Sequence, residues 1–176
     1  MQTYTVSDYE KLSGEDRWEL IKGVFHMFMS PSPQRTHQRI SLNLSVELGG
    51  IYKNKKCEVY AAPTDVELAP DTVVQPDLLI VCDLDKMTEQ RCAGSPDLII
   101  EILSKSSMKR DCVEKLHLYE EFGVREYWIV NPERKSVLVY ILENGEYAEP
   151  VTYKKDGKIT LSIDPDATVD LADIFV

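Results

Sequence analysis

The sequence predicts a mixed α/β fold, and three patterns in its 176 residues carry that prediction. The first is a succession of strand, long helix and strand over residues 97–130, which is typical of a crossover between parallel strands. The second is an amphipathic helix in which Ile40, Leu44 and Leu48 recur every four residues. The third is a set of short antiparallel strands near both ends of the chain. Together these patterns place the chain in the mixed α/β class.

Length and composition favour one domain over residues 1–176. A chain of this length buries roughly two-thirds of its unfolded surface on folding, and we find no linker, repeat or low-complexity tract. The hydrophobic fraction of 43% and the charged fraction of 28% are ordinary for a soluble globular protein. No apolar stretch is long enough to span a bilayer, and the N-terminus lacks the pattern of a signal peptide. We therefore expect a cytoplasmic protein.

The N-terminal part of the chain predicts a short helix, a hairpin and the amphipathic helix. Residues 7–12 begin with a serine and carry a glutamate three residues later, which is the spacing of a capping box. Residues 17–29 hold two apolar strands joined by Lys22-Gly23, and Glu19 lies on the first of them. The amphipathic helix follows a Ser-Pro-Ser-Pro break and should stop near Gly49-Gly50.

Strands are expected through the middle of the chain. Three candidates lie at residues 58–61, 65–68 and 73–81, and the turn residues 69–72 separate the last two. A polar loop then leads to Gly94-Ser95, where the crossover unit begins. A Pro-Asp pair, Pro76-Asp77, lies within the range 73–81, and a similar pair, Pro96-Asp97, begins the strand expected over 97–103.

The crossover unit and the C-terminal strands complete the prediction. The strand 97–103 leads into a helix that Ser106 or Ser107 can cap, and a strand returns at 126–130. Antiparallel strands then follow, with Asn144-Gly145 as a hairpin turn. Their expected ranges are 136–142, 146–153 and 158–163.

Two carboxylates in apolar strands are the main indication of chemistry. Glu101 interrupts one buried run, and Asp77 stands at the head of the other. Residues alternate between the two faces of a strand, so a suitable register of neighbouring strands would bring both acids to one point. Burying an ionised carboxylate without a partner costs several kcal/mol, so the partner is a basic side chain or a metal ion. Oxygen ligands at one point suit Mg²⁺, which typically takes one or two protein carboxylates.

Charge and cysteine content limit the other possibilities. The formal net charge of −10 argues against non-specific coating of nucleic acid. Residues 31–46 and 104–118 are nevertheless locally basic, and the first segment carries Arg35, His37 and Arg39 without an acid. The four cysteines lack a C-x-x-C spacing, so a zinc site is unsupported, and we interpret them as reduced thiols.

A series of short motifs occurs in one order along nearly the whole chain. The motifs are Trp18-Glu-Leu-Ile-Lys-Gly23, Ser30-Pro-Ser-Pro followed by His37, Pro76-Asp77, Gly94-Ser-Pro-Asp-Leu98, Glu101-Ile-Leu-Ser104, Asp111-x-x-x-Lys115, Tyr119 and Gly123-Val-Arg-Glu-Tyr-Trp-Ile-Val-Asn-Pro132. In this order the chain resembles the Uma-two family of endonucleases, within the restriction-endonuclease-like, PD-(D/E)XK superfamily. The resemblance implies a central mixed β-sheet flanked by helices, with Asp77 and Glu101 as the acids of the first and second motifs.

One position departs from the superfamily pattern. Leu103 stands two residues after the second acid, where a lysine is usual, and an apolar side chain cannot polarise water or phosphate. In the family that the chain resembles, a lysine from the following helix takes this place, and Lys115 matches it. Glu19 and His37 also match family positions. The resemblance thus implies a catalytic set of Asp77, Glu101, Lys115, Glu19 and His37, in which Asp77 and Glu101 are the metal ligands.

Two functional interpretations stay open. The first is a Mg²⁺-dependent endonuclease that hydrolyses DNA phosphodiester bonds, with Mn²⁺ as a substitute metal and a homodimer as the expected assembly. The second is a non-catalytic DNA-binding or protein-assembly domain that retains the nuclease fold, which Leu103 and the net charge permit. At the level of residues, Asp77 and Glu101 could instead form buried ion pairs, and Asp111 with Lys115 could be a surface pair on a helix.

Overall fold

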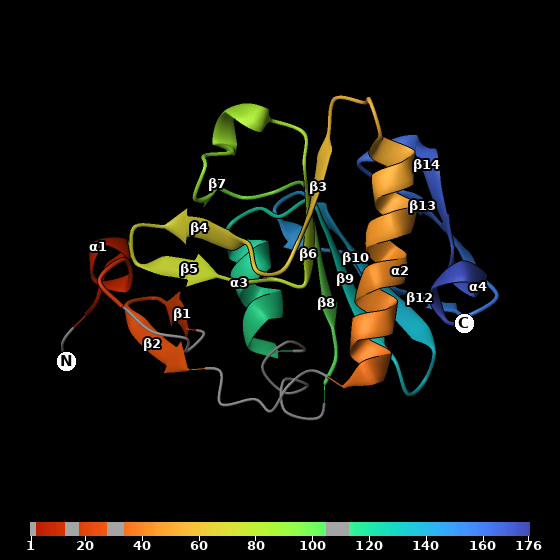
Figure 1. The fold of residues 1–176 in the computed structure, drawn as a ribbon, viewed down its shortest axis with the longest axis horizontal. Helices are drawn as coiled ribbons and strands as arrows, with labels where there is room; N and C mark the ends of the chain where they lie inside the picture. Colours follow the sequence, from red (N-terminus) through yellow and green to blue (C-terminus); the bar gives the residue numbers. More distant parts are fainter. Residues whose placement is uncertain (1–2, 13–17, 28–33, 105–112) are drawn as a thin grey trace.

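A seven-stranded mixed sheet forms the centre of the computed structural model, which describes residues 3–12, 18–27, 34–104 and 113–176. Its strands β8 and β9 are parallel, and its other pairs are antiparallel. Figure 1 shows this large sheet with α2 (Arg35–Tyr52) on one side and α3 (Lys115–Glu121) on the other. In spatial order the strands are β11 (Glu146–Tyr147), β10 (Ser136–Glu143), β9 (Glu126–Asn131), β8 (Leu98–Ile102), β6 (Leu78–Val81) and β3 (Glu58–Ala61), and β12 (Val151–Lys154) also pairs with β10. The mixed α/β class and the flanked central sheet are confirmed.

A smaller five-stranded sheet covers α3 from outside and carries the predicted N-terminal hairpin (Figure 1). Lys22 and Gly23 form its turn, with φ angles of 50° and 76°. A Cβ on Gly23 would lie 2.3 Å from the Thr3 side chain, so this turn requires glycine. The strands of this sheet are β2 (Val24–Met27), β1 (Trp18–Ile21), β5 (Thr72–Val74), β4 (Asp65–Ala69) and β7 (Arg91–Ala93).

The expected single strand over residues 73–81 is wrong, because Pro76 divides it. Proline cannot donate to a strand ladder, and the chain leaves the small sheet after β5 and enters the large sheet at β6. Asp77 lies in the connection between these two strands. The division therefore sets Asp77 at the junction of the two sheets.

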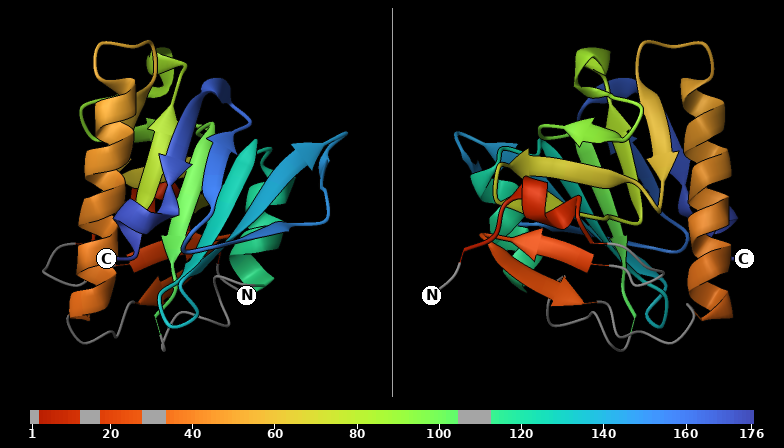
Figure 2. Two further views of the ribbon diagram at one scale, coloured as in Figure 1. Left: turned by 90° about the vertical axis from the view of Figure 1, so that its right-hand side faces the viewer. Right: turned by 60° about the vertical axis from the view of Figure 1, so that its left-hand side comes forward.

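The two faces of the large sheet bury two separate cores, and the predicted alternation of β8 decides which residue enters which. Leu98, Ile100 and Ile102 pack with α2, whereas Ile99 and Leu103 pack with α3. On the α2 side lie the hairpin of β13 (Lys158–Leu161) and β14 (Asp164–Asp170) and the short helix α4 (Leu171–Ile174), as Figure 2 shows.

Several predicted boundaries differ from the observed ones. The first helix, α1 (Val6–Tyr9), is capped by Thr5 with Asp8 rather than by the serine two residues later. Helix α2 passes through Gly49-Gly50 and ends at Tyr52, whose side chain is 5% exposed, so burial of that ring outweighs the helix penalty of two glycines.

The predicted polar loop also contains structure. It forms the 3₁₀ turn η1 (Leu84–Lys86) and β7, which pairs in parallel with β4.

The crossover prediction is confirmed, and the C-terminal prediction is incomplete. β8, α3 and β9 follow one another, and β8 and β9 are parallel. The expected helix cap at Ser106 or Ser107 lies outside the described residues. Asn144-Gly145 forms the predicted turn with positive φ at both residues, but Pro150 divides the expected strand that follows. β14 and α4 were not predicted.

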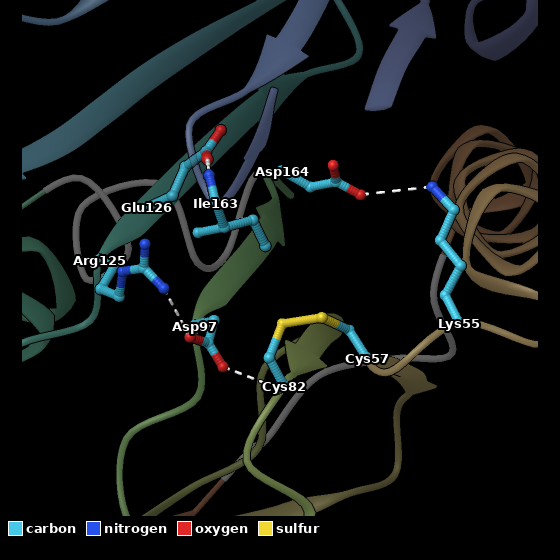
Figure 3. Close-up of a disulfide and its surroundings, with 8 residues drawn as sticks. All are labelled: Lys55, Cys57, Cys82, Asp97, Arg125, Glu126, Ile163 and Asp164. Atoms are coloured by element: carbon cyan, nitrogen blue, oxygen red, sulfur yellow. Dashed lines mark hydrogen bonds and ion pairs between the residues drawn. A yellow bond between two sulfur atoms is a disulfide. The ribbon is translucent and has the colours of Figure 1, made fainter. Parts of the chain in front are cut away.

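The interpretation of all cysteines as reduced thiols is wrong for one pair. β3 pairs with β6 so that Glu58 faces Val81, which brings the flanking Cys57 and Cys82 together at a Cα–Cα distance of 4.0 Å. They form a disulfide, shown in Figure 3. Cys92 is a buried free thiol, and burial raises its pKa to about 11. No helix within the described ranges is long and apolar enough to cross a membrane.

Candidate active site

Asp77 and Glu101 come from neighbouring antiparallel segments of the large sheet. β6 and β8 pair Leu78 with Ile100, and continuing this register by one residue brings Asp77 opposite Glu101. Directly opposed residues have Cβ atoms about 4.5–5.5 Å apart. Ile99, two residues before Glu101, packs in the core beneath α3, so Glu101 shares that face of the sheet.

Asp77 is held by one backbone donor and one imidazole. Its Oδ2 accepts a hydrogen bond from Ile102 N at 2.7 Å and lies 3.2 Å from His37 Nε2. Ile102 directly follows Glu101, so this bond ties the Asp77 carboxylate to the strand that carries the second acid. The Asp77 and His37 side chains are 21% and 16% exposed, which makes them the accessible side of the cluster.

Lys115 lies between two buried carboxylates. Its Nζ is 2.7 Å from Glu101 Oε1 and 2.8 Å from Glu19 Oε1, and the three side chains are at most 5% exposed. Tyr119, one turn later on α3, donates from its hydroxyl to Glu101 Oε1 at 2.8 Å. Glu101 thus receives a charged and a neutral donor from the same helix face.

A second layer of hydrogen bonds holds Glu19 and the segment that leads to Asp77. Gln75 N donates to Glu19 Oε1 at 3.0 Å, and Gln75 Nε2 donates to Asp65 Oδ1 at 2.7 Å. Tyr9 donates to the same oxygen of Asp65 at 3.1 Å. Burial, and then the charge of Asp65, raise the pKa of the Tyr9 hydroxyl above its usual range, so Tyr9 stays a donor. The backbone one residue before Pro76-Asp77 is therefore anchored on both sides.

The donor set suits a hard divalent cation. Within the described residues the cluster holds three carboxylates (Glu19, Asp77 and Glu101) and one ammonium (Lys115), a formal charge of −2 with His37 neutral. No group of three His, Cys, Asp or Glu side chains in that part of the chain is arranged as a complete metal site. Mg²⁺ needs no such group, because one or two carboxylates with water and a substrate phosphate complete its octahedron. Asp77 and Glu101 fit this requirement.

The structure brings together all five residues singled out from the sequence. Glu19 is fully buried rather than on a solvent-facing strand, and His37 reaches Asp77 from the first turn of α2. Asp111 lies outside the described residues. Sequence reasoning missed Gln75 and named Tyr119 only as part of a motif. The one available signal for Tyr119 was its position four residues after Lys115, on the same helix face.

Comparisons with known proteins identify the family and the fold. The family model Uma2, described as "Putative restriction endonuclease", matches residues 6–172. Among solved structures, the chain is similar to one described as "a putative nuclease belonging to DUF820" from Anabaena variabilis, with a TM-score of 0.79, 19% sequence identity and 97% of each chain covered. That likeness supports the fold. A comparison with curated proteins gives no match.

Proposed function

The chain belongs to the Uma2 family, whose description is "Putative restriction endonuclease", and on that premise we propose that it is a Mg²⁺-dependent endonuclease that hydrolyses phosphodiester bonds in DNA. One observation carries the proposal. The β6–β8 register, continued by one residue, sets Asp77 opposite Glu101, Asp77 accepts a hydrogen bond from the neighbouring Ile102 N, and the Lys115 ammonium is 2.7 Å from Glu101. Paired carboxylates beside a fixed cation provide the charges that phosphodiester hydrolysis needs.

Asp77 and Glu101 are the residues that would hold Mg²⁺. A bound Mg²⁺ supplies Lewis acidity toward the phosphate oxygen and a water of lowered pKa. Asp77 is held by the amide of Ile102, the residue next to Glu101, and by His37. His37 therefore has a positioning role in this proposal.

Lys115 is the residue proposed to stabilise the charge that develops on the phosphate. Its ammonium cannot turn away, because Glu19 and Glu101 hold it from two sides in a buried position. A fixed cation costs no reorganisation when the negative charge forms, which is how preorganised groups lower a barrier. Glu19 and Tyr119 then act as positioning residues, one on Lys115 and the other on Glu101.

The test is nicking of supercoiled plasmid at low salt with Mg²⁺ or Mn²⁺. We expect the wild type to nick and Glu101→Ala to lose at least about 10²-fold in rate. The control is Glu143→Gln, an exposed acid at the end of β10, which should nick as the wild type does. Equal nicking by wild type and Glu101→Ala would refute the assignment. We also expect a homodimer, which light scattering tests.

The non-catalytic alternative rests on Leu103 and on the ion pairs of Lys115. Leu103 supplies no charge beside Glu101, and the Glu19–Lys115–Glu101 contacts are also those of a structural buried ion triad. Calorimetry separates the two interpretations. Mg²⁺ binding that disappears in Glu101→Gln favours the nuclease, and a wild type that binds DNA but neither Mg²⁺ nor Mn²⁺ favours the non-catalytic domain.

A further inference from the structure

A basic groove lies beside the candidate active site, and its cations come from two distant parts of the chain. Arg35 and Arg39 lie one turn apart on α2, and Lys135 lies in the turn between β9 and β10. All three side chains are exposed and line one groove of about 330 Å³. The sequence analysis indicated Arg35 and Arg39 as part of a basic segment, but not Lys135.

The charge of this groove is not neutralised by the ion pairs that the structure describes. Seven other basic residues in the described ranges each lie within 4.0 Å of an acid, and they are Lys11, Lys22, Lys55, Arg91, Lys115, Arg125 and Lys158. Arg35, Arg39 and Lys135 form none of the ion pairs found in those ranges. Six further lysines and arginines in those ranges, Lys53 and Lys56 among them, also form none of these pairs. Arg35, Arg39 and Lys135 differ in lining one groove, where they create a local positive field in a chain of formal charge −10.

The groove adjoins a smaller cavity at the edge of the candidate active site. It shares Thr36 and Pro132 with this cavity of about 30 Å³, which is also lined by His37 and Leu103. His37 contacts Asp77, and Leu103 lies two residues after Glu101. A polyanion lying in the groove would thus continue toward the two acids.

The floor of the groove is apolar and rigid. Ile40, Ile174 and Phe175 line it and are at most 6% exposed, because they belong to the core beneath α2. Asn43 Nδ2 donates to Ile174 O at 3.1 Å and fixes α4 against α2. The buried floor fixes the backbone positions from which the three exposed cations extend, and cationic side chains suit contacts to phosphate rather than to base edges.

We propose that Arg35, Arg39 and Lys135 bind the DNA phosphate backbone beside the scissile bond. This inference rests on the proposed function, since it names where the same site holds the flanking part of its substrate. Each cation that neutralises a phosphate releases counterions, so the contacts contribute affinity at low salt and little sequence preference. Lysine and arginine contacts to phosphate position a nucleic acid, and the carboxylates then act on the bond that this position selects.

The test measures DNA binding without metal, so that no cleavage occurs. A fluorescein-labelled duplex of arbitrary sequence is titrated with protein in EDTA at several salt concentrations, and a single strand of the same sequence is titrated in parallel. We expect Arg35→Gln/Arg39→Gln to bind about 10-fold or more weakly at low salt and to reduce the slope of log K against log salt by about 1.8 for duplex. Adding Lys135→Gln should reduce that slope by about 0.9 more.

The matched control removes two charges from the segment that directly follows the far end of the same helix. Lys53 and Lys56 are exposed and lie beyond Tyr52, and the 18 residues of α2 span about 27 Å, so Lys53→Gln/Lys56→Gln changes the net charge equally but leaves the groove intact. We expect this variant to keep most of the wild-type affinity and slope. Equal losses in both double variants, or a wild type that retains neither probe at low salt, would overturn the groove.

The outcome also separates this inference from the proposed function. Suppose that the wild type binds DNA but never nicks plasmid, and that the groove variants bind more weakly. This result would support phosphate binding in the groove and refute the nuclease function. If the wild type nicks plasmid, and Arg35→Gln/Arg39→Gln leaves its KM and salt slope unchanged, the proposed function stands and phosphate binding by the groove is refuted. The probe that loses more affinity, duplex or single strand, identifies the form of DNA that lies there.

Discussion

Two buried glutamates on neighbouring parallel strands have partners of different kinds. Glu126 on β9 is fully buried and accepts hydrogen bonds from Trp128 Nε1 at 2.7 Å, Ser162 N at 2.8 Å and Ser162 Oγ at 2.7 Å. Figure 3 shows it directed at the Ile163 amide in the β13–β14 turn. Glu101 on β8 instead contacts Lys115 and Tyr119, on the other face of the sheet.

The difference separates a structural carboxylate from one suited to chemistry. Neutral donors that include backbone amides hold Glu126 as a fixed anchor for the C-terminal hairpin, and they leave one negative charge dispersed over several hydrogen bonds. Glu101 belongs to a cluster with Glu19, Asp77 and Lys115, where acids outnumber bases within the described residues. Like charges held close together favour a site that gains a cation.

The largest expected effect comes from removing the base of that cluster. Lys115→Met leaves the buried Glu19 and Glu101 carboxylates without their shared ammonium, so we expect a loss of about 3–5 kcal/mol in unfolding free energy. Urea denaturation measures it. Glu19→Gln in the same background should recover part of the loss, and a single variant as stable as the wild type would show that the buried charges are already compensated elsewhere.

The next effect tests the structural side of the comparison. Glu126→Gln replaces an acceptor oxygen by an amide that points donors at Ser162 or Trp128, so we expect a loss of about 3 kcal/mol. Denaturation gives the stability, and calorimetry on the folded variant should give wild-type Mg²⁺ affinity. If Mg²⁺ binding failed together with stability, Glu126 would not be independent of the candidate site.

Glu101→Gln should show the opposite pattern to Glu126→Gln, because it should keep the stability of the fold and lose Mg²⁺ binding. It relieves repulsion among the acids while Glu19 still holds Lys115, so we expect a change below about 1 kcal/mol without metal. Saturating Mg²⁺, at about 100 times the dissociation constant, should stabilise the wild type by about 2.7 kcal/mol and leave this variant unchanged. Thermal unfolding with and without Mg²⁺ measures both values, and an equal metal shift in the two proteins contradicts the assignment of Glu101 as a ligand.

The smallest effect concerns the hairpin that Glu126 anchors. Lys158, and then the Ala172 amide, lower the pKa of Asp170 below its usual 3.8. A depressed folded pKa means that the ionised group stabilises the fold above pH 3.8 and that this contribution disappears as pH falls through the folded pKa. Asp170→Asn should therefore lower the urea midpoint slightly at neutral pH and not at about pH 2. A difference that persists in acid would exclude ionisation as the cause.

Local pattern was sufficient for much of the fold. The alternation of apolar residues correctly assigned Ile99 and Leu103 to one core and Ile100 to the other, because side chains on a strand alternate by geometry alone. The turns at Lys22-Gly23 and Asn144-Gly145 were also predictable from local sequence, because Gly23, Asn144 and Gly145 are residue types that adopt positive φ readily.

Long-range pairing decided the features that the sequence predicted wrongly or left open. Pro76 interrupts the strand expected over residues 73–81, and only the tertiary structure shows that the two parts pair in different sheets. The disulfide follows from the register of β3 on β6, which neither cysteine indicates by its spacing. β14 consists largely of polar residues and depends on its partner β13 for its strand conformation.

The sequence by itself indicated Asp77 and Glu101 as the acids of the candidate site, because an acid within an apolar strand requires a partner wherever that strand lies, and the family resemblance added Lys115, Glu19 and His37. Only the tertiary structure decided which side chains contact these acids. Tyr119 and Gln75 joined the cluster, and Lys135 came to lie beside Arg35 in the groove, through contacts between segments far apart in the chain. Periodicity assigns a side chain to a face, but which faces meet depends on strand register and on chain crossings that act over the whole sequence.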